Sequence, residues 1–134
     1  MTQILLIDDD EPVRAMLARM LTHFGHIVIE ARNGKEGIEH FRASGADLVI
    51  TDIVMPEMEG FEVLIELRKM GSPVKVIAMS GGGRQNPADV LRIASHLGAA
   101  RVLAKPFSNE LLMAAIKELV PEDAKDPPKI GALD

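Results

Sequence analysis

Short runs of apolar residues recur along the chain, and most of their members are β-branched or aliphatic. They fall at residues 4–7, 27–29, 48–50, 74–79 and 102–104. Each run is nearly continuous in apolar character and does not alternate with polar residues. This pattern is typical of strands that are covered on both faces of a sheet. The sequence therefore predicts five such strands.

Between these runs, apolar residues repeat at intervals of three and four, which is the spacing of one helix face. The first such stretch contains Val13, Met16, Leu17, Met20, Leu21 and Phe24. We expect the methionines at core spacings, Met16, Met20, Met79 and Met113, to fill gaps in the core. Further helices are predicted to begin after Asn33, at Gly60, after Asn86 and after Ser108. Glu36 is placed to complete a capping box with Asn33.

A strand followed by a helix is thus predicted five times in succession. Such alternation predicts an α/β fold with a parallel sheet and helices on both faces, because crossover connections are right-handed and must cover the sheet. Residues 1–120 form the predicted domain. Residues 121–134 contain three prolines and mixed charge, so we expect a flexible end or the start of a linker.

Composition narrows the class of function. The chain has 134 residues, with 15 Lys and Arg against 20 Asp and Glu, which gives a net charge of −5. This acidic balance argues against direct binding of nucleic acid. No apolar run approaches the ~20 residues of a membrane span, and the N-terminal residues do not form a signal peptide. We expect a cytoplasmic domain without membrane insertion; the lack of cysteine excludes disulfides and thiolate chemistry.

Residues with metal-binding or phosphate-binding chemistry stand directly after four of the apolar runs. The carboxyl ends of parallel strands meet at one edge of a sheet, where ligands bind. The residues at these ends are Asp8 and Asp9, Asp52, Ser80 and Gly81, and Lys105. Asp10 and Glu11 are expected instead to cap the first helix and to favour its dipole.

These residue types fit a divalent cation and a phosphate group. Carboxylates that lie close together repel one another unless a cation lies among them. Oxygen ligands favour Mg²⁺ or Mn²⁺, and Lys105 and the N–H groups of Gly81 and Gly82 would complement phosphate. Each signal alone is weak, because an aspartate after a strand is common and the glycines lack the spacing of a P-loop or a dinucleotide fold.

The segments LLIDDDEPVR, LVITDIVMPEMEGFEVL, VIAMSG and VLAKPF follow one another within residues 3–120. On these motifs the chain resembles a response-regulator receiver domain of bacterial two-component signalling, of the single-domain, chemotaxis-regulator-like kind. The resemblance implies a flavodoxin-like, doubly wound fold with a five-stranded parallel sheet in the order 2-1-3-4-5. It also implies a switch that catalyses only its own phosphorylation and dephosphorylation.

By the same resemblance, Asp52 is the phosphoacceptor, which takes a phosphoryl group from a histidine kinase or a phosphotransfer protein. Asp9 and Asp52 would bind Mg²⁺ directly, Asp8 would act largely through water, and the Val54 carbonyl would complete the protein ligands. Ser80 and Lys105 would each contact a phosphoryl oxygen. This division of roles agrees with phosphoryl transfer, which depends on positioning and charge neutralisation.

The resemblance also predicts how the signal leaves the domain. The added charge is expected to draw Ser80 inward and to change the surface of the predicted helix 87–97, strand 102–104 and helix 109–120, where a downstream protein would bind. Val102 departs from the family pattern, in which Tyr or Phe often stands at this position and swings inward. An aliphatic side chain has no ring to rotate. The domain would act as a monomer or dimerise on phosphorylation.

Two alternatives fit part of the pattern. Asp8 and Asp10 have the Asp-x-Asp spacing of a Mg²⁺-dependent phosphatase or phosphotransferase of the haloacid-dehalogenase kind, but Pro12 stands where that signature has Thr or Val. The other alternative is a receiver-like interaction domain that is never phosphorylated. It would need none of the polar residues that the chain retains, namely Asp9, Asp52, Ser80 and Lys105.

Overall fold

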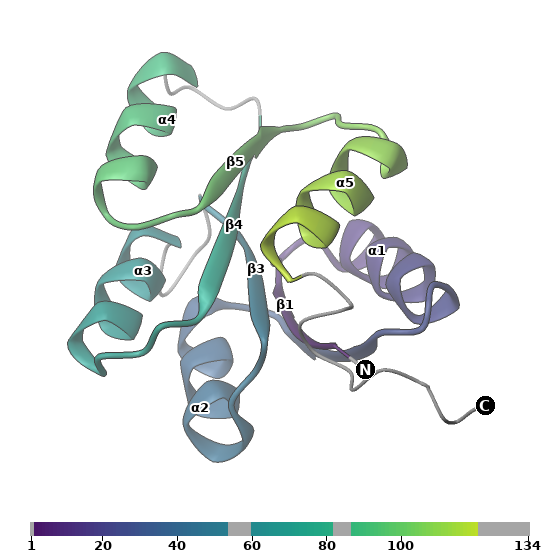
Figure 1. The fold of residues 1–134 in the computed structure, drawn as a ribbon, viewed down its shortest axis with the longest axis horizontal. Helices are drawn as coiled ribbons and strands as arrows, with labels where there is room; N and C mark the ends of the chain where they lie inside the picture. Colours follow the sequence, from purple (N-terminus) through teal and green to yellow (C-terminus); the bar gives the residue numbers. More distant parts are fainter. Residues whose placement is uncertain (1, 54–59, 82–86, 121–134) are drawn as a thin grey trace, which may run out of the picture.

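A computed structural model describes residues 2–53, 60–81 and 87–120. Within these ranges five strands alternate with five helices (Figure 1). The strands are β1 (Gln3–Ile7), β2 (Ile27–Ala31), β3 (Leu48–Asp52), β4 (Lys75–Ser80) and β5 (Arg101–Ala104). The helices are α1 (Glu11–His23), α2 (Gly34–Ser44), α3 (Gly60–Lys69), α4 (Pro87–His96) and α5 (Asn109–Leu119). The expected N-cap Asn86 and the tail 121–134 lie outside the described residues.

All strand pairs are parallel, and the sheet order is β2-β1-β3-β4-β5. The predicted α/β fold and strand order are therefore confirmed. Helices α1 and α5 cover one face of the sheet, and α2, α3 and α4 cover the other (Figure 1). No helix among the described residues is long and apolar enough to cross a membrane.

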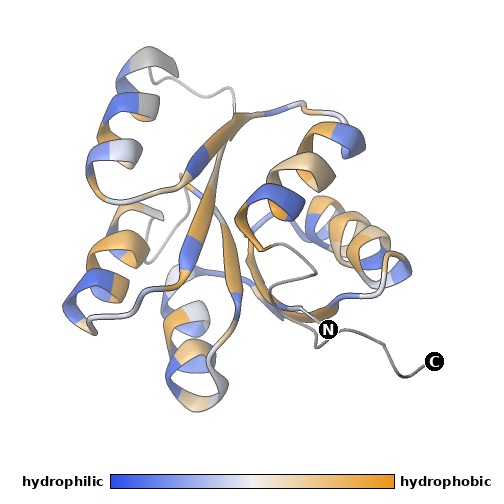
Figure 2. Cartoon of the chain, in the orientation of Figure 1, coloured by the Kyte–Doolittle hydropathy of each residue, from blue (hydrophilic) through white to orange (hydrophobic). Residues whose placement is uncertain are grey.

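The core consists of two hydrophobic layers, one on each face of the sheet. Successive residues of a strand point to opposite faces, so neighbours in β1 enter different layers. Leu6 packs with α1 and α5, whereas Leu5 and Ile7 pack with α2, α3 and α4. Figure 2 shows strands that are mostly hydrophobic and helices that carry both hydrophobic and hydrophilic residues. Two-sided burial explains why the central strands are continuous apolar runs.

The two edge strands are less covered than the central ones. Every residue of β3 is buried, whereas Ile27 of β2 is 47% exposed and Arg101 and Ala104 of β5 are exposed. Both faces of β2 and β5 contribute residues to the hydrophobic layers, as expected, but part of each strand is exposed. An edge strand has a neighbour on only one side, so less of its surface is shielded.

Helix ends follow the sequence signals closely. The Asn33 side chain accepts the N–H of Glu36 at 2.8 Å, and the Ser108 hydroxyl accepts the N–H of Leu111 at 3.0 Å. Both residues are N-caps, as predicted. The Glu36 carboxylate accepts the N–H of Arg32, the residue before the cap, at 2.7 Å. The acceptor Glu36 is thus the expected one, but the N–H donor is shifted by one residue, from Asn33 to Arg32.

One methionine prediction is wrong. Met79 is buried, and Met20 and Met113 pack against the core as expected. Met16, however, is 56% exposed, and Phe24 is 57% exposed just after α1. Both lie at the margin of the apolar stripe of α1. Helical spacing alone does not show whether the neighbouring helix α5 covers a side chain at this margin.

Candidate functional site

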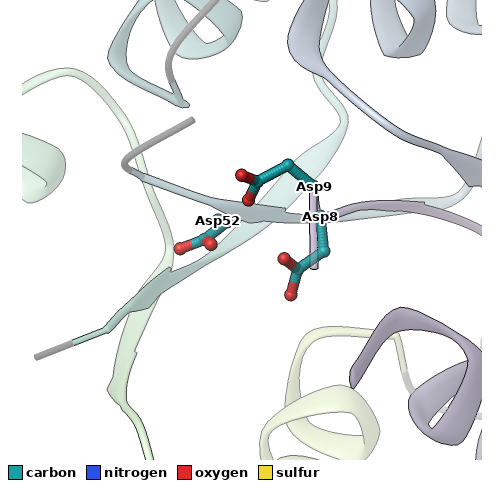
Figure 3. Close-up of side chains that lie close together, drawn as sticks. All are labelled: Asp8, Asp9 and Asp52. Atoms are coloured by element: carbon teal, nitrogen blue, oxygen red, sulfur yellow. The ribbon is translucent and has the colours of Figure 1, made fainter. Parts of the chain in front are cut away.

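The register of the parallel strands brings the predicted carboxylates together. Ile7 of β1 pairs with Thr51 of β3. The residues that follow these two, Asp8 and Asp52, therefore come side by side. Asp9 follows in the β1–α1 loop and is exposed to solvent. One carboxylate oxygen from each acid lies within 4.8 Å of the other two. Figure 3 shows the three side chains at this edge of the sheet.

The two inner acids are held by specific donors. Asp8 is fully buried; its Oδ1 accepts the N–H of Asp10 and its Oδ2 accepts from Lys105 Nζ, both at 3.0 Å. The Asp52 side chain is 10% exposed. Its Oδ1 accepts the N–H of Ile53 at 2.9 Å, and its Oδ2 lies 3.4 Å from Lys105 Nζ. Lys105 therefore bridges two buried carboxylates.

Burial and neighbouring charges shift the pKa values of Asp52 and Lys105. Burial raises the pKa of Asp52 to about 6; the Lys105 ammonium opposes this rise and the Asp8 carboxylate adds to it. Burial lowers the pKa of Lys105, but its hydrogen bond to Asp8 and the charge of Asp52 outweigh burial, so the pKa lies above its usual value. Lys105 is thus an ammonium at neutral pH. One ammonium does not neutralise three acids, so the arrangement of the three carboxylates is consistent with the binding of a further cation.

Strands β4 and β5 bring the remaining polar residues to the same edge. Asp52 pairs with Met79 of β4, and Ser80 is the next residue. The Ser80 carbonyl accepts the N–H of Lys105 at 2.8 Å. A Cβ on Gly81 would lie 3.6 Å from Lys105 Cδ, which places Gly81 beside the lysine side chain. The edge therefore combines acids, a lysine, a hydroxyl residue and a glycine.

The sequence model of the response regulator receiver domain family matches residues 4–117. The chain belongs to this family. Chemotaxis protein CheY of Bacillus subtilis is 32% identical over 117 residues, which are 87% of this chain and 95% of CheY. Response regulator MprA of Mycobacterium sp. (strain KMS) is 32% identical over 137 residues, covering 98% of this chain and 58% of MprA. The receiver domain thus spans little more than half the length of that relative.

A solved receiver structure is similar as well. The response regulator TrrA of Thermotoga maritima, solved in complex with Mg²⁺–BeF, is 30% identical with a TM-score of 0.78. The match covers 90% of this chain and 100% of the TrrA chain. Fold and sequence together identify a receiver domain of the two-component response regulators, which places the chain in phosphorelay signalling.

Three residues predicted for the receiver site are not among its described neighbours. Val54, the expected carbonyl ligand, lies outside the described residues, as does Gly82. Val102 pairs with Ala78 in the sheet and packs, partly buried, on the hydrophobic layer that includes Val90 of α4. Its side chain contributes to the core between the sheet and α4.

Asp10 does not join the acidic cluster of the receiver domain. Its Oδ1 accepts the N–H of Val13 at 3.2 Å, so Asp10 is the N-cap of α1, as predicted. Glu11 follows as an acidic residue in the first turn. The Asp-x-Asp spacing with Asp8 therefore reflects a helix cap, which weakens the phosphatase alternative.

Gly60 has a structural role that spacing along the sequence did not reveal. Its N–H donates to the Ile53 carbonyl at 2.8 Å. A Cβ at this position would lie 2.3 Å from the Asp52 carbonyl oxygen and 2.7 Å from Ile53 Cα. Only glycine fits against this backbone. A glycine inside the first turn of a helix, where it is unfavourable, is the signal that points to such a contact.

Arg14 was also missed by sequence reasoning. Its side chain is 11% exposed. Its Nη1 donates to the Asp8 carbonyl at 2.9 Å, and its Nε donates to Glu30 Oε1 at 3.0 Å. These contacts join α1 to the β1–α1 loop, six residues before Arg14, and to β2, 16 residues after it. No spacing rule for helices or strands indicates either contact.

Proposed function

We propose that the chain is a phosphoacceptor switch in which Asp52 takes a phosphoryl group from a histidine kinase or a phosphotransfer protein. The observation that carries this proposal is the position of the Asp52 carboxylate. One oxygen is held by the N–H of Ile53, and the other lies 3.4 Å from the Lys105 ammonium and beside Asp8. The nucleophilic carboxylate is therefore held in place, and the Lys105 ammonium lies where it can neutralise the charge of an incoming phosphoryl group.

The acidic cluster fits Mg²⁺ or Mn²⁺. Oxygen atoms from Asp8, Asp9 and Asp52 lie within 4.8 Å of one another, and such a set of oxygen donors suits a small, hard ion. Asp9 and Asp52 would bind the ion directly, Asp8 largely through water, and the Val54 carbonyl would complete the protein ligands. The complex of TrrA with Mg²⁺–BeF supports this assignment. When bound, the ion supplies positive charge to the phosphoryl oxygens.

Phosphoryl transfer requires little covalent chemistry from the protein and depends mainly on positioning and charge neutralisation. An Asp52 oxygen attacks phosphorus, the new O–P bond forms, and the electron pair of the broken P–N bond leaves with the imidazole of the donor histidine. Lys105 pairs with one phosphoryl oxygen, and the Ser80 hydroxyl donates to another, with Gly81 close to the same oxygens. The chain catalyses no reaction besides its own phosphorylation and dephosphorylation.

The product adds about −1.5 to −2 charge at a buried edge, which draws Ser80 and its loop toward the phosphoryl group. This movement changes the surface of α4, β5 and α5, where a downstream protein would bind. Val102 of β5 has no aromatic ring and packs on the hydrophobic layer that includes Val90 of α4, so the signal would not pass through a ring rotation at this position. Residues 1–120 would form this cytoplasmic switch, as a monomer or a phosphorylation-dependent dimer, and 121–134 a tail or linker.

The proposal is tested by incubating the full chain with Mg²⁺ and acetyl phosphate and then measuring the intact mass. The wild-type protein is expected to gain one phosphoryl group, and Asp52→Asn to gain none. Asp10→Asn is the matched control, because asparagine also caps helices and the site remains intact. An adduct of equal yield on Asp52→Asn would contradict the proposal. Turnover of a phosphate ester would favour a phosphatase, and a lack of any adduct would favour an interaction domain.

A further inference from the structure

The β1–α1 loop, which carries Asp8 and Asp9, has its backbone held from two sides. The N–H of Asp8 donates to the carbonyl of Ala31 in β2 at 3.1 Å. The carbonyl of Asp8 accepts from Arg14 Nη1 at 2.9 Å. This carbonyl belongs to the peptide group that joins Asp8 to Asp9. Arg14 therefore fixes the plane from which the exposed Asp9 side chain extends.

Arg14 is in turn oriented by β2. Its Nε donates to Glu30 Oε1 at 3.0 Å, and Glu30 directly precedes Ala31, the acceptor for the Asp8 N–H. The guanidinium group is planar and rigid, so fixing one N–H sets the direction of the others. The Arg14 side chain is 11% exposed and that of Glu30 43%. Arg14 thus connects the half-exposed Glu30 carboxylate of the edge strand β2 with the β1–α1 loop.

We propose that Arg14, oriented by Glu30, is a positioning residue for the cation site. It holds the Asp8–Asp9 peptide so that the Asp9 carboxylate stays within reach of Asp52. The inference rests on the proposed function, since it concerns the cation that the three acids would hold. Groups behind the direct ligands of a metal fix ligand orientation, and their loss typically weakens affinity about 10–100-fold.

The change in charge and the loss of positioning have opposite effects on Mg²⁺ affinity when Arg14 is replaced, so a binding measurement distinguishes them. Removing the positive charge of Arg14 leaves the acidic edge more negative, and this change by itself would tighten the binding of a divalent cation. Loss of positioning weakens that binding instead. Glu30 acts only through Arg14, so its removal has no further effect once Arg14 is gone.

The test is a Mg²⁺ titration of the full chain by calorimetry, with the amide NMR shifts of Asp8 and Asp9 as a second readout. Arg14→Met is expected to raise the Kd for Mg²⁺ about tenfold and Glu30→Gln about threefold. The double variant should match Arg14→Met, because the two residues act as one unit. Arg42→Met is the matched control: Arg42 pairs with Glu66 at 3.4 Å between α2 and α3, and its loss should leave the Kd unchanged.

Equal or tighter Mg²⁺ binding by folded Arg14→Met would overturn the proposal. Additive effects of the two substitutions would overturn the role of Glu30. Should Arg14→Met not fold, Arg14→Lys decides, because it keeps the positive charge and removes the guanidinium group that contacts both Glu30 and the Asp8 carbonyl, so only loss of positioning would raise its Kd. Failure of the wild-type chain to bind Mg²⁺ would instead contradict the proposed function, so the two failures are distinguishable.

Discussion

Ile50 and Asp52 lie two residues apart on the same side of β3, and both are buried, but their effects on the fold are opposite. Ile50 packs with Leu6 in the layer beneath α1 and α5. Asp52 lies against Asp8 and Lys105 at the end of the strand. The body of the strand stabilises the molecule, whereas its end holds charges that burial disfavours.

The size of this difference follows from the pKa of Asp52. Burial raises it from 3.8 to about 6. Since each pKa unit corresponds to about 1.4 kcal/mol, keeping Asp52 ionised in the folded, metal-free protein costs on the order of 1–3 kcal/mol. Fully burying an isoleucine contributes about as much in the favourable direction. The sheet interior therefore contributes stability that offsets the cost of the buried charges at the site.

The largest expected effect comes from the strand body. Ile50→Ala leaves a cavity in a layer that no solvent reaches, so we expect the free energy of unfolding to fall by about 3–4 kcal/mol. Urea unfolding of both proteins measures the difference, and Ile50→Val should lose only about 1 kcal/mol. A loss below about 1 kcal/mol for the alanine variant would show that β3 is not a main source of stability.

The next effect comes from removing the cation that bridges the inner acids. Lys105→Met leaves Asp8 and Asp52 without their ammonium, and the metal-free protein should lose about 1–3 kcal/mol near pH 8. Near about pH 5 the loss should be smaller, because Asp52 is then protonated and repels Asp8 less. Equal losses at both pH values would contradict the electrostatic origin of the effect.

A smaller effect is the pH dependence of the metal-free wild-type protein. The pKa of Asp52 is higher in the folded state, about 6, than its ordinary value of 3.8, so the folded state binds more protons between these values. Stability relative to Asp52→Asn should therefore be greatest below about pH 4 and fall as the pH rises to about 6, by on the order of 1–2 kcal/mol. Unfolding of both proteins with EDTA across this range gives the difference. A difference that does not vary with pH would contradict the raised pKa.

Local signals were sufficient for most of the fold. The apolar runs and the caps Asn33 and Ser108 depend on residues close in sequence, so periodicity and capping rules predict them. The strand order came from the motif resemblance and not from periodicity. The exposure of Ile27 and Met16 was missed, because it depends on which strand lies at an edge and how far a helix extends.

For the site, too, some features could be predicted from the sequence and others depend on the tertiary structure. Asp8, Asp52, Ser80 and Lys105 were predicted to share an edge because parallel strands end on the same side. The contact of Arg14 with the Asp8 carbonyl could not be predicted in this way, since the direction of the Arg14 side chain depends on its second partner, Glu30 of β2.

The most direct test of the account is the effect of Mg²⁺ on the unfolding free energy of the wild-type protein and Asp52→Asn. In EDTA at about pH 7.5, Asp52→Asn should be more stable than the wild-type protein by about 1–2 kcal/mol, because asparagine carries no buried charge. Mg²⁺ at about 100 times its Kd should stabilise the wild-type protein by about 2.7 kcal/mol and the variant by much less. A wild-type protein more stable than the variant in EDTA, or equal stabilisation of both by Mg²⁺, would contradict the claim that these buried acids serve a cation.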